Sequence, residues 1–96
     1  MLLMAATLSR HAAHQAQRRG ISPATVDLVL AHADRSQPLR GGARALWVSR
    51  RKRKSLTLNG FAPSEIDRVS GIRLIVSFDD DVIITVEHML TRRRFA

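Results

Sequence analysis

The 96-residue chain has no cysteine, and only four of its residues are aromatic. The lack of cysteine excludes a disulfide framework and thiolate metal ligands. No apolar run approaches the roughly 20 residues that span a bilayer. The apolar opening, residues 1–8, lacks the basic region that precedes the apolar core of a signal peptide. These absences predict a cytoplasmic protein that needs no cofactor or metal and does not bind membranes.

Positive charge dominates the composition. Sixteen Lys and Arg oppose eight Asp and Glu, for a net charge of +8, and fourteen of the sixteen cations are Arg. Arginine offers a planar fork of donors that matches phosphate. Ten cations gather in a block over residues 40–54, which has no acid, and in a run near the end: Arg40, Arg44, Arg50, Arg51, Lys52, Arg53, Lys54, Arg92, Arg93 and Arg94.

Such clustering is the electrostatic pattern of a protein that binds nucleic acid. We therefore predict that these ten residues contact a nucleic acid, with RNA favoured over DNA. Two alternatives stay open: a solvated basic surface, and a docking site for an acidic protein. The few aromatic residues give no indication of a platform on which bases stack.

Capping residues predict two helices near the start of the chain. Ser9 is an N-cap for a helix over residues 10–19, and Gly20 ends that helix. Ser22 then caps a second helix that ends near Ala33. The connection between them is very short, so we expect an αα-hairpin.

The middle of the chain gives weaker signals. Residues 35–42 contain Ser, Pro and two Gly and are predicted to form a loop. Ala45–Val48 is a short apolar run, typical of a well-covered strand, and we assign its Trp47 to the core. Ser49 caps a basic helix over residues 50–56, or else the strand continues through them.

The last third combines a short helix over residues 62–69 with two alternating β-branched runs. These runs, residues 72–78 and 82–88, flank the acidic Asp79–Asp81 and predict a β-hairpin. The acidic residues are interpreted as its turn, because the glycine and distant glutamate of an EF-hand loop are missing. No internal repeat is evident.

The elements together predict one α+β domain over residues 1–96. We expect the N-terminal αα-hairpin to pack on a small, mainly antiparallel sheet that ends in the β-hairpin. Residues 1–8 are expected to be a flexible N-terminus, and residues 92–96 a basic tail.

Histidines are the candidates for catalysis. His11 and His14 are three residues apart on the first helix, and His88 lies near the end of the last strand. A histidine with arginine neighbours can transfer a proton and stabilise a pentavalent phosphate, as metal-independent RNA cleavage requires. The catalytic candidates are His11 and His88 as acid and base, with Arg50 stabilising the transition state. The alternative is that the histidines are polar surface residues.

The segment from Ser9-Arg10-His11-Ala12 to Arg19-Gly20-Ile21-Ser22 resembles the opening of a family of uncharacterized bacterial domains, S-x-H-A-x-x-R-x-x-x-R-G-I-S. That family is grouped by distant fold similarity with RelE/ParE-like toxins and barnase-like ribonucleases. The resemblance implies helices on an antiparallel sheet, a ribonuclease of toxin–antitoxin type and an acidic antitoxin-like partner. His11, Arg19 and Gly20 match the pattern, whereas Gln15 replaces its first Arg. A non-catalytic module that binds nucleic acid or the ribosome is the alternative.

Overall fold

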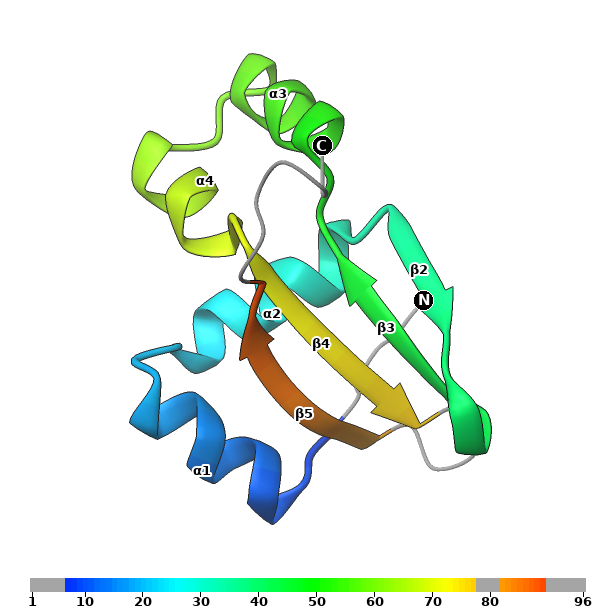
Figure 1. Cartoon of the computed structure of the whole chain (residues 1–96). Coiled ribbons are helices and arrows are strands. Elements are labelled where there is room, and N and C mark those ends of the chain that lie inside the picture. Colours follow the sequence, from blue (N-terminus) through cyan, green and yellow to red (C-terminus); the bar gives the residue numbers. More distant parts are fainter. Residues whose placement is uncertain (1–6, 78–81, 90–96) are drawn as a thin grey trace.

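The computed structural model describes residues 7–77 and 82–89, which form one mixed sheet with helices packed beside it (Figure 1). In chain order the elements are β1 (Thr7–Leu8), α1 (Arg10–Arg18), α2 (Pro23–His32), β2 (Arg35–Pro38), the 3-10 helix η1 (Arg40–Gly42), β3 (Ala43–Trp47), α3 (Arg50–Leu58), α4 (Pro63–Val69), β4 (Ile72–Ser77) and β5 (Val82–His88). The strand order is β1-β5-β4-β3-β2, and every pair is antiparallel except β1–β5. The α+β class, the αα-hairpin and the final β-hairpin are thus confirmed.

The main core lies between the sheet and the helices. Strand β4 turns its alternate residues Ile72, Leu74 and Val76 toward this core, and each is at most 6% exposed. Helix α2 crosses the sheet behind β3 and β4 and contributes Val26 and Val29, while α1 lies along β5 (Figure 1). The alternation seen in the sequence therefore reports one buried sheet face.

The opposite face of the sheet carries Trp47, contrary to the prediction that this side chain belongs to the core. Trp47 is half-buried and lies opposite Arg73 in the β3–β4 register, on the side away from Leu74. Arg73 forms an ion pair with Glu87, its partner on β5. A mixed face of this kind is common in small antiparallel sheets.

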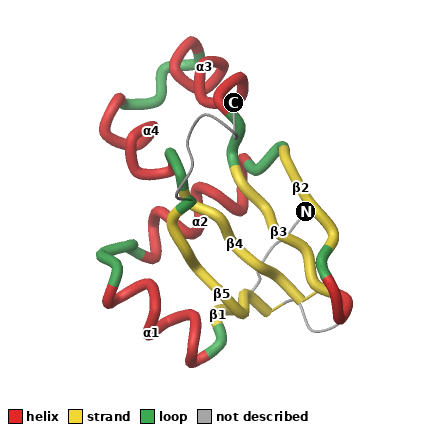
Figure 2. The backbone as a smooth tube through the Cα atoms, viewed as in Figure 1, coloured by secondary structure: helices red, strands yellow, loops and turns green. Residues whose placement is uncertain are grey.

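Two strands appear where the sequence predicts none. Residues 35–38 belong to the predicted loop but form β2, an exposed edge strand paired with β3 (Figure 2). This strand contains Pro38 and no apolar alternation, so it is recognised by its pairing with β3 rather than by its sequence pattern. Thr7 and Leu8 form β1 rather than a flexible end, because they pair with Val82 and Ile83. Residues 1–6, Asp79–Asp81 and Arg92–Arg94 lie outside the described residues.

Candidate nucleic-acid interface

Helix α3 carries the densest run of cations, and its first turn is anchored from outside the helix. Ser49 is its N-cap, with Oγ accepting from the Lys52 N–H at 3.0 Å. Ser49 also donates from its N–H and its Oγ to the two carboxylate oxygens of Asp34, at 2.7 and 2.6 Å. Burial raises the pKa of Asp34, but hydrogen bonds from Ser49 and the charge of Arg35 outweigh it, so this pKa lies below its ordinary value. Asp34 is therefore a carboxylate at neutral pH.

The anchor compensates for an unfavourable charge distribution in α3. The N-terminus of a helix is the positive end of its dipole, so cations in the first turn destabilise it. Arg50, Arg51 and Lys52 occupy that turn, which contains no acidic residue. Asp34 supplies the missing negative charge from the end of α2. Cations at the start of a helix are locally unfavourable, and here a residue from elsewhere in the fold offsets them. Such a conflict between local preference and fold is typical of a functional surface.

Three of the cations of α3 face solvent. Arg50, Arg51 and Lys54 are exposed, and none of the acidic residues in the described part of the chain forms an ion pair with them. Their spacing places them on one side of the helix, where like charges four residues apart repel each other. A bound anion relieves that repulsion. We call these three residues the α3 face.

Arg53 has a structural role instead. Its Nη1 donates to the Val48 carbonyl oxygen at 3.0 Å, which ties α3 to the end of β3. Partial burial and the charge of Arg50 lower the pKa of Arg53, against an opposing effect of Asp34. A half-buried guanidinium bonded to the backbone is poorly placed to reach a ligand, so Arg53 is not part of the α3 face.

The predicted basic block is divided by β3. Arg40 lies in η1 and Arg44 at the start of β3, whereas α3 follows the other end of that strand (Figure 1). A five-residue strand separates its ends by about 13 Å. Arg44 is half-buried and donates from Nη1 to Ser36 Oγ at 3.0 Å. Neighbours in sequence therefore lie at different ends of the sheet.

The three catalytic candidates are not brought together. His11 lies in the first turn of α1, while His88 Nε2 lies 3.5 Å from the carbonyl oxygen of Arg19, just past the other end of that helix. Eight helical residues correspond to about 12 Å. Arg50 begins α3, at the far end of the molecule from α1 (Figure 1). These residues thus form no common centre within one molecule.

The opening segment has a structural explanation. Strand β1 pairs with the outer edge of β5 only at Val82 and Ile83. Farther along that edge, side chains of α1 and of its C-cap residue hydrogen-bond to the backbone of β5. Gln15 Oε1 accepts from the Val86 N–H at 3.1 Å, and Arg19 Nη1 donates to the Val86 carbonyl oxygen at 2.8 Å. The exposed edge of a strand is thereby satisfied by side chains. Gln15 and Arg19 hold α1 on the sheet.

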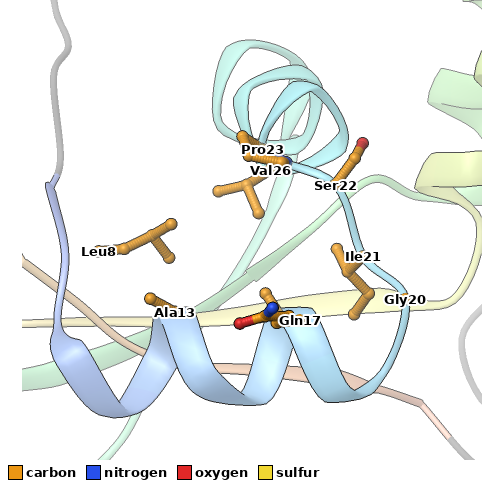
Figure 3. Close-up of a pocket in the computed structure, with 9 residues that line it drawn as sticks. Leu8, Ala13, Gln17, Gly20, Ile21, Ser22, Pro23 and Val26 are labelled. Atoms are coloured by element: carbon orange, nitrogen blue, oxygen red, sulfur yellow. The ribbon is translucent and has the colours of Figure 1, made fainter.

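Two hollows flank α1. One is a shallow depression on its outer side, lined by Arg10, His11, His14 and Arg18. The sequence pattern placed His11, His14 and, one turn further along, Arg18 on one face of this helix, whereas Arg10 was not singled out, although its helical spacing gives the signal. The other is an apolar groove of about 510 Å³ between α1 and α2, which Figure 3 shows with Leu8 and Ile21 among its lining residues. Only the first hollow has the charge to attract an anion.

The described residues contain no group of three or more His, Asp or Glu that could hold a metal ion. Within the same residues, no helix has the length and apolar character to cross a bilayer. The candidate binding surfaces are therefore the two cationic ones, on α3 and on α1.

No family model, curated protein or solved structure matches the chain. The resemblance of the opening segment to uncharacterized bacterial domains therefore stays a prediction. The function has to be argued from the residues themselves, with the α3 face as the main candidate surface.

Proposed function

We propose that this protein is a cytoplasmic module that binds nucleic acid through its phosphate groups, with the α3 face as the main contact. The observation that carries the proposal is the exposure of Arg50, Arg51 and Lys54 on one side of a helix, without an acidic partner among the described residues. Arg and Lys in this arrangement release condensed counterions when they neutralise phosphates, which favours binding without any recognition of bases.

The α3 face supports backbone contact rather than base stacking. Binders of single strands commonly combine cations with exposed aromatic rings. The α3 face contains no such ring, and Trp47 is half-buried on the sheet. We therefore expect steep salt dependence and little sequence preference. RNA is the first nucleic acid to test, because the opening segment resembles domains that are grouped with ribonucleases.

The test measures the affinity for an RNA duplex and for a DNA duplex of the same sequence by fluorescence anisotropy, over a range of salt concentrations. In the Arg50→Gln, Arg51→Gln, Lys54→Gln variant we expect an affinity about 10- to 100-fold weaker and a log–log salt slope reduced by about 3. The matched control removes three exposed cations from other elements: Arg35→Gln, Arg40→Gln and Arg68→Gln.

We expect this control to bind nearly as well as the original protein. Equal losses in the two variants would contradict a specific α3 face, since they would show that net charge alone drives binding. Circular dichroism of both variants checks that the fold is retained.

A second candidate, an acidic protein partner, is favoured by one observation. Leu58 is 87% exposed and follows Arg50 and Lys54 at intervals of four residues, so it extends the same stripe. An acidic segment with an apolar side chain would complement such a stripe. If nucleic acid is the partner, Leu58→Ser leaves the affinity for RNA unchanged. A loss of RNA affinity comparable to that of the triple variant would contradict our assignment.

Toxin-type RNA cleavage is the remaining alternative, and we propose binding without turnover instead. The separation of His11, His88 and Arg50 supports this choice. RNA incubated with a stoichiometric amount of protein, in the presence of a chelator that removes metal ions, should stay intact. Cleavage that disappears in His11→Ala and in His88→Ala would overturn the proposal in favour of a ribonuclease.

A further inference from the structure

The helix pairs α1–α2 and α3–α4 share a local pattern of caps and turns, here called the repeat, at an offset of 40 residues. Helices α1 and α3 have equal lengths, and α2 and α4 both begin at a proline. Six residue pairs at this offset are identical: Ser9 and Ser49, Arg10 and Arg50, Gly20 and Gly60, Pro23 and Pro63, Asp27 and Asp67, Val29 and Val69. These six identities make up a weak repeat at one offset, which the initial interpretation of the sequence did not identify.

Hydrogen bonds at the start of α1 and α3 match, both those to the cap side chains and those within the backbone. Ser9 Oγ accepts from the N–H three residues on at 3.0 Å, and Ser49 Oγ does the same at 3.0 Å. The serine carbonyl oxygens then accept from Ala13 and Arg53, each at 2.9 Å. Equal caps begin both helices at equivalent positions.

The ends of α1 and α3 match as well. Gly20 and Gly60 both have positive φ, at 68° and 92°. The residues that follow them, Ile21 and Phe61, donate to carbonyl oxygens five residues back, at 2.8 and 3.1 Å. Both ends are thus Schellman motifs, and the repeat extends through the connection to the second helix.

The repeat also relates the outward side chains of the two first helices. The positions of the α3 face, Arg50, Arg51 and Lys54, correspond to Arg10, His11 and His14. All of these side chains are exposed, and α1 contains no acidic residue. Arg18 adds a further exposed cation on α1, where α3 has Leu58. The two first helices therefore present cationic or protonatable groups at equivalent positions.

We propose that the outer side of α1, formed by Arg10, His11, His14 and Arg18, is a second contact for the phosphate backbone of nucleic acid, in addition to the α3 face. Hereafter we call these four residues the α1 face. The hollow that they line provides the concave surface, and charge complementarity identifies the partner. The inference rests on the proposed function, because it assigns the same ligand to a second site.

The α1 face differs from the α3 face in one testable respect. Two of its four groups are histidines, and the imidazole is the side chain class that serves proteins as a switch near neutral pH, whereas the α3 face consists of Arg and Lys alone. Helix α1 packs on β1, which has no ionisable side chain, and on β5. On β5, Glu87 is paired with Arg73, and His88 lies beside the Arg19 carbonyl oxygen at the other end of α1. The described residues of β1 and β5 therefore offer no acidic partner to positive charge on the α1 face.

The experiment compares four proteins at pH 5.5 and at pH 8, at constant ionic strength, with an RNA duplex as the probe. They are the original protein, His11→Gln with His14→Gln, the α3-face triple variant, and His88→Gln as the histidine control. We expect the original protein to bind about tenfold more tightly at pH 5.5 than at pH 8, with a salt slope steeper by about 2. The double histidine variant should lose this pH response, while the α3-face variant and the His88→Gln control should keep it.

The outcomes separate the two proposals. If the α3-face variant binds RNA more weakly but the double histidine variant keeps the pH response, the assignment of the α1 face is contradicted and the proposed function stands. Unchanged binding by the α3-face variant, with the pH response lost in the double histidine variant, overturns the proposed function and retains the α1 face as the contact. Vesicles containing phosphatidylglycerol form the last arm: binding to them in place of RNA, lost in the double histidine variant, would make the α1 face a lipid contact and overturn the inference.

Discussion

Helices α1 and α3 share their caps, their length and their end signals, yet they are packed in different ways. Helix α1 lies on β5 and contacts β1, whereas the main helical neighbour of α3 is α4. The difference follows from the side chains that face inward. In α1 these are Ala12, Gln15 and Ala16, all buried. In α3 the equivalent positions hold Lys52, Ser55 and Leu56, of which only Leu56 is buried.

The comparison teaches that capping residues determine where a helix forms along the chain, whereas its inward-facing side chains determine which element it packs against. Small residues let α1 approach the strand closely enough for Gln15 to reach the backbone of Val86. Lys52 gives α3 no such surface, because its ammonium group has to stay in water. Helix α3 is held instead at its first turn, by Ser49 and Asp34. Its outward cations are consequently free to meet a ligand.

The largest effect is expected from exchanging inward residues between the two helices. Ala12 is 0% exposed, so Ala12→Lys forces a long charged side chain into the contact of α1 with β5. We expect a loss of about 3 kcal/mol or more in the free energy of unfolding, from overpacking and desolvation. Lys52→Ala should change it by less than about 0.5 kcal/mol. Urea unfolding followed by circular dichroism measures both, and comparable losses would contradict the different roles of the two helices.

A smaller effect is expected from the next inward position. Gln15→Ala removes the acceptor of the Val86 N–H, and we expect a loss of about 1–3 kcal/mol because a buried donor is left unsatisfied. Ser55→Ala, at the equivalent position of α3, should be nearly neutral. Hydrogen exchange of the Val86 amide provides the local measurement. Unchanged protection of that amide in Gln15→Ala would show that the Gln15 side chain does not hydrogen-bond to the backbone of β5.

The smallest effect concerns the anchors of the two N-caps. Ser9 donates its N–H to the Ile83 carbonyl oxygen at 2.9 Å, whereas Ser49 donates to the titratable Asp34. The pKa of Asp34 in the fold lies below its ordinary value of 3.8. The stability that this carboxylate contributes is therefore present above pH 3.8 and is lost as the pH falls through the lowered pKa. The effect should stay below about 1 kcal/mol, since Asp34 is exposed.

Acid should therefore loosen the start of α3 before that of α1. Nuclear magnetic resonance of the Arg53 and Ala13 amides, whose N–H groups bond to Ser49 and Ser9, measures the two starts separately. The Asp34→Asn variant is the control, in which the difference between the two amides should no longer depend on pH. Equal loosening of both amides in the original protein would contradict the assigned anchor.

Much of the fold was predictable because its signals are local. Ser9 and Ser49 begin helices, Gly20 ends the first of them, and alternation along β4 marks its buried face. The helix after Ser49 was expected to end at residue 56 and runs to Leu58. Strand β2 was missed because its exposed residues carry no apolar pattern. The repeat was missed because its six identities are widely spaced and gain meaning only when the caps and turns are superposed.

The candidate site was predictable only in part. The cations of α3 were identified from their density, but Arg40 and Arg44 were grouped with them although β3 places these residues at its other end. The structural role of Arg53 depends on its bond to the Val48 carbonyl oxygen, and no spacing rule indicates that bond. Arg10 was overlooked because a single cation at the start of a helix rarely stands out.

By itself the sequence determined where α1 begins and ends and where α2 begins, because a serine cap and a Schellman motif are completed within a few residues. It also determined the abundance of positive charge. The tertiary structure decided which side of each helix is buried, which strands become edges, and which cations remain exposed to a ligand. Those outcomes depend on contacts between residues far apart in the chain, such as Gln15 with Val86 and Asp34 with Ser49. Burial and pairing of that kind are properties of the assembled sheet and helices.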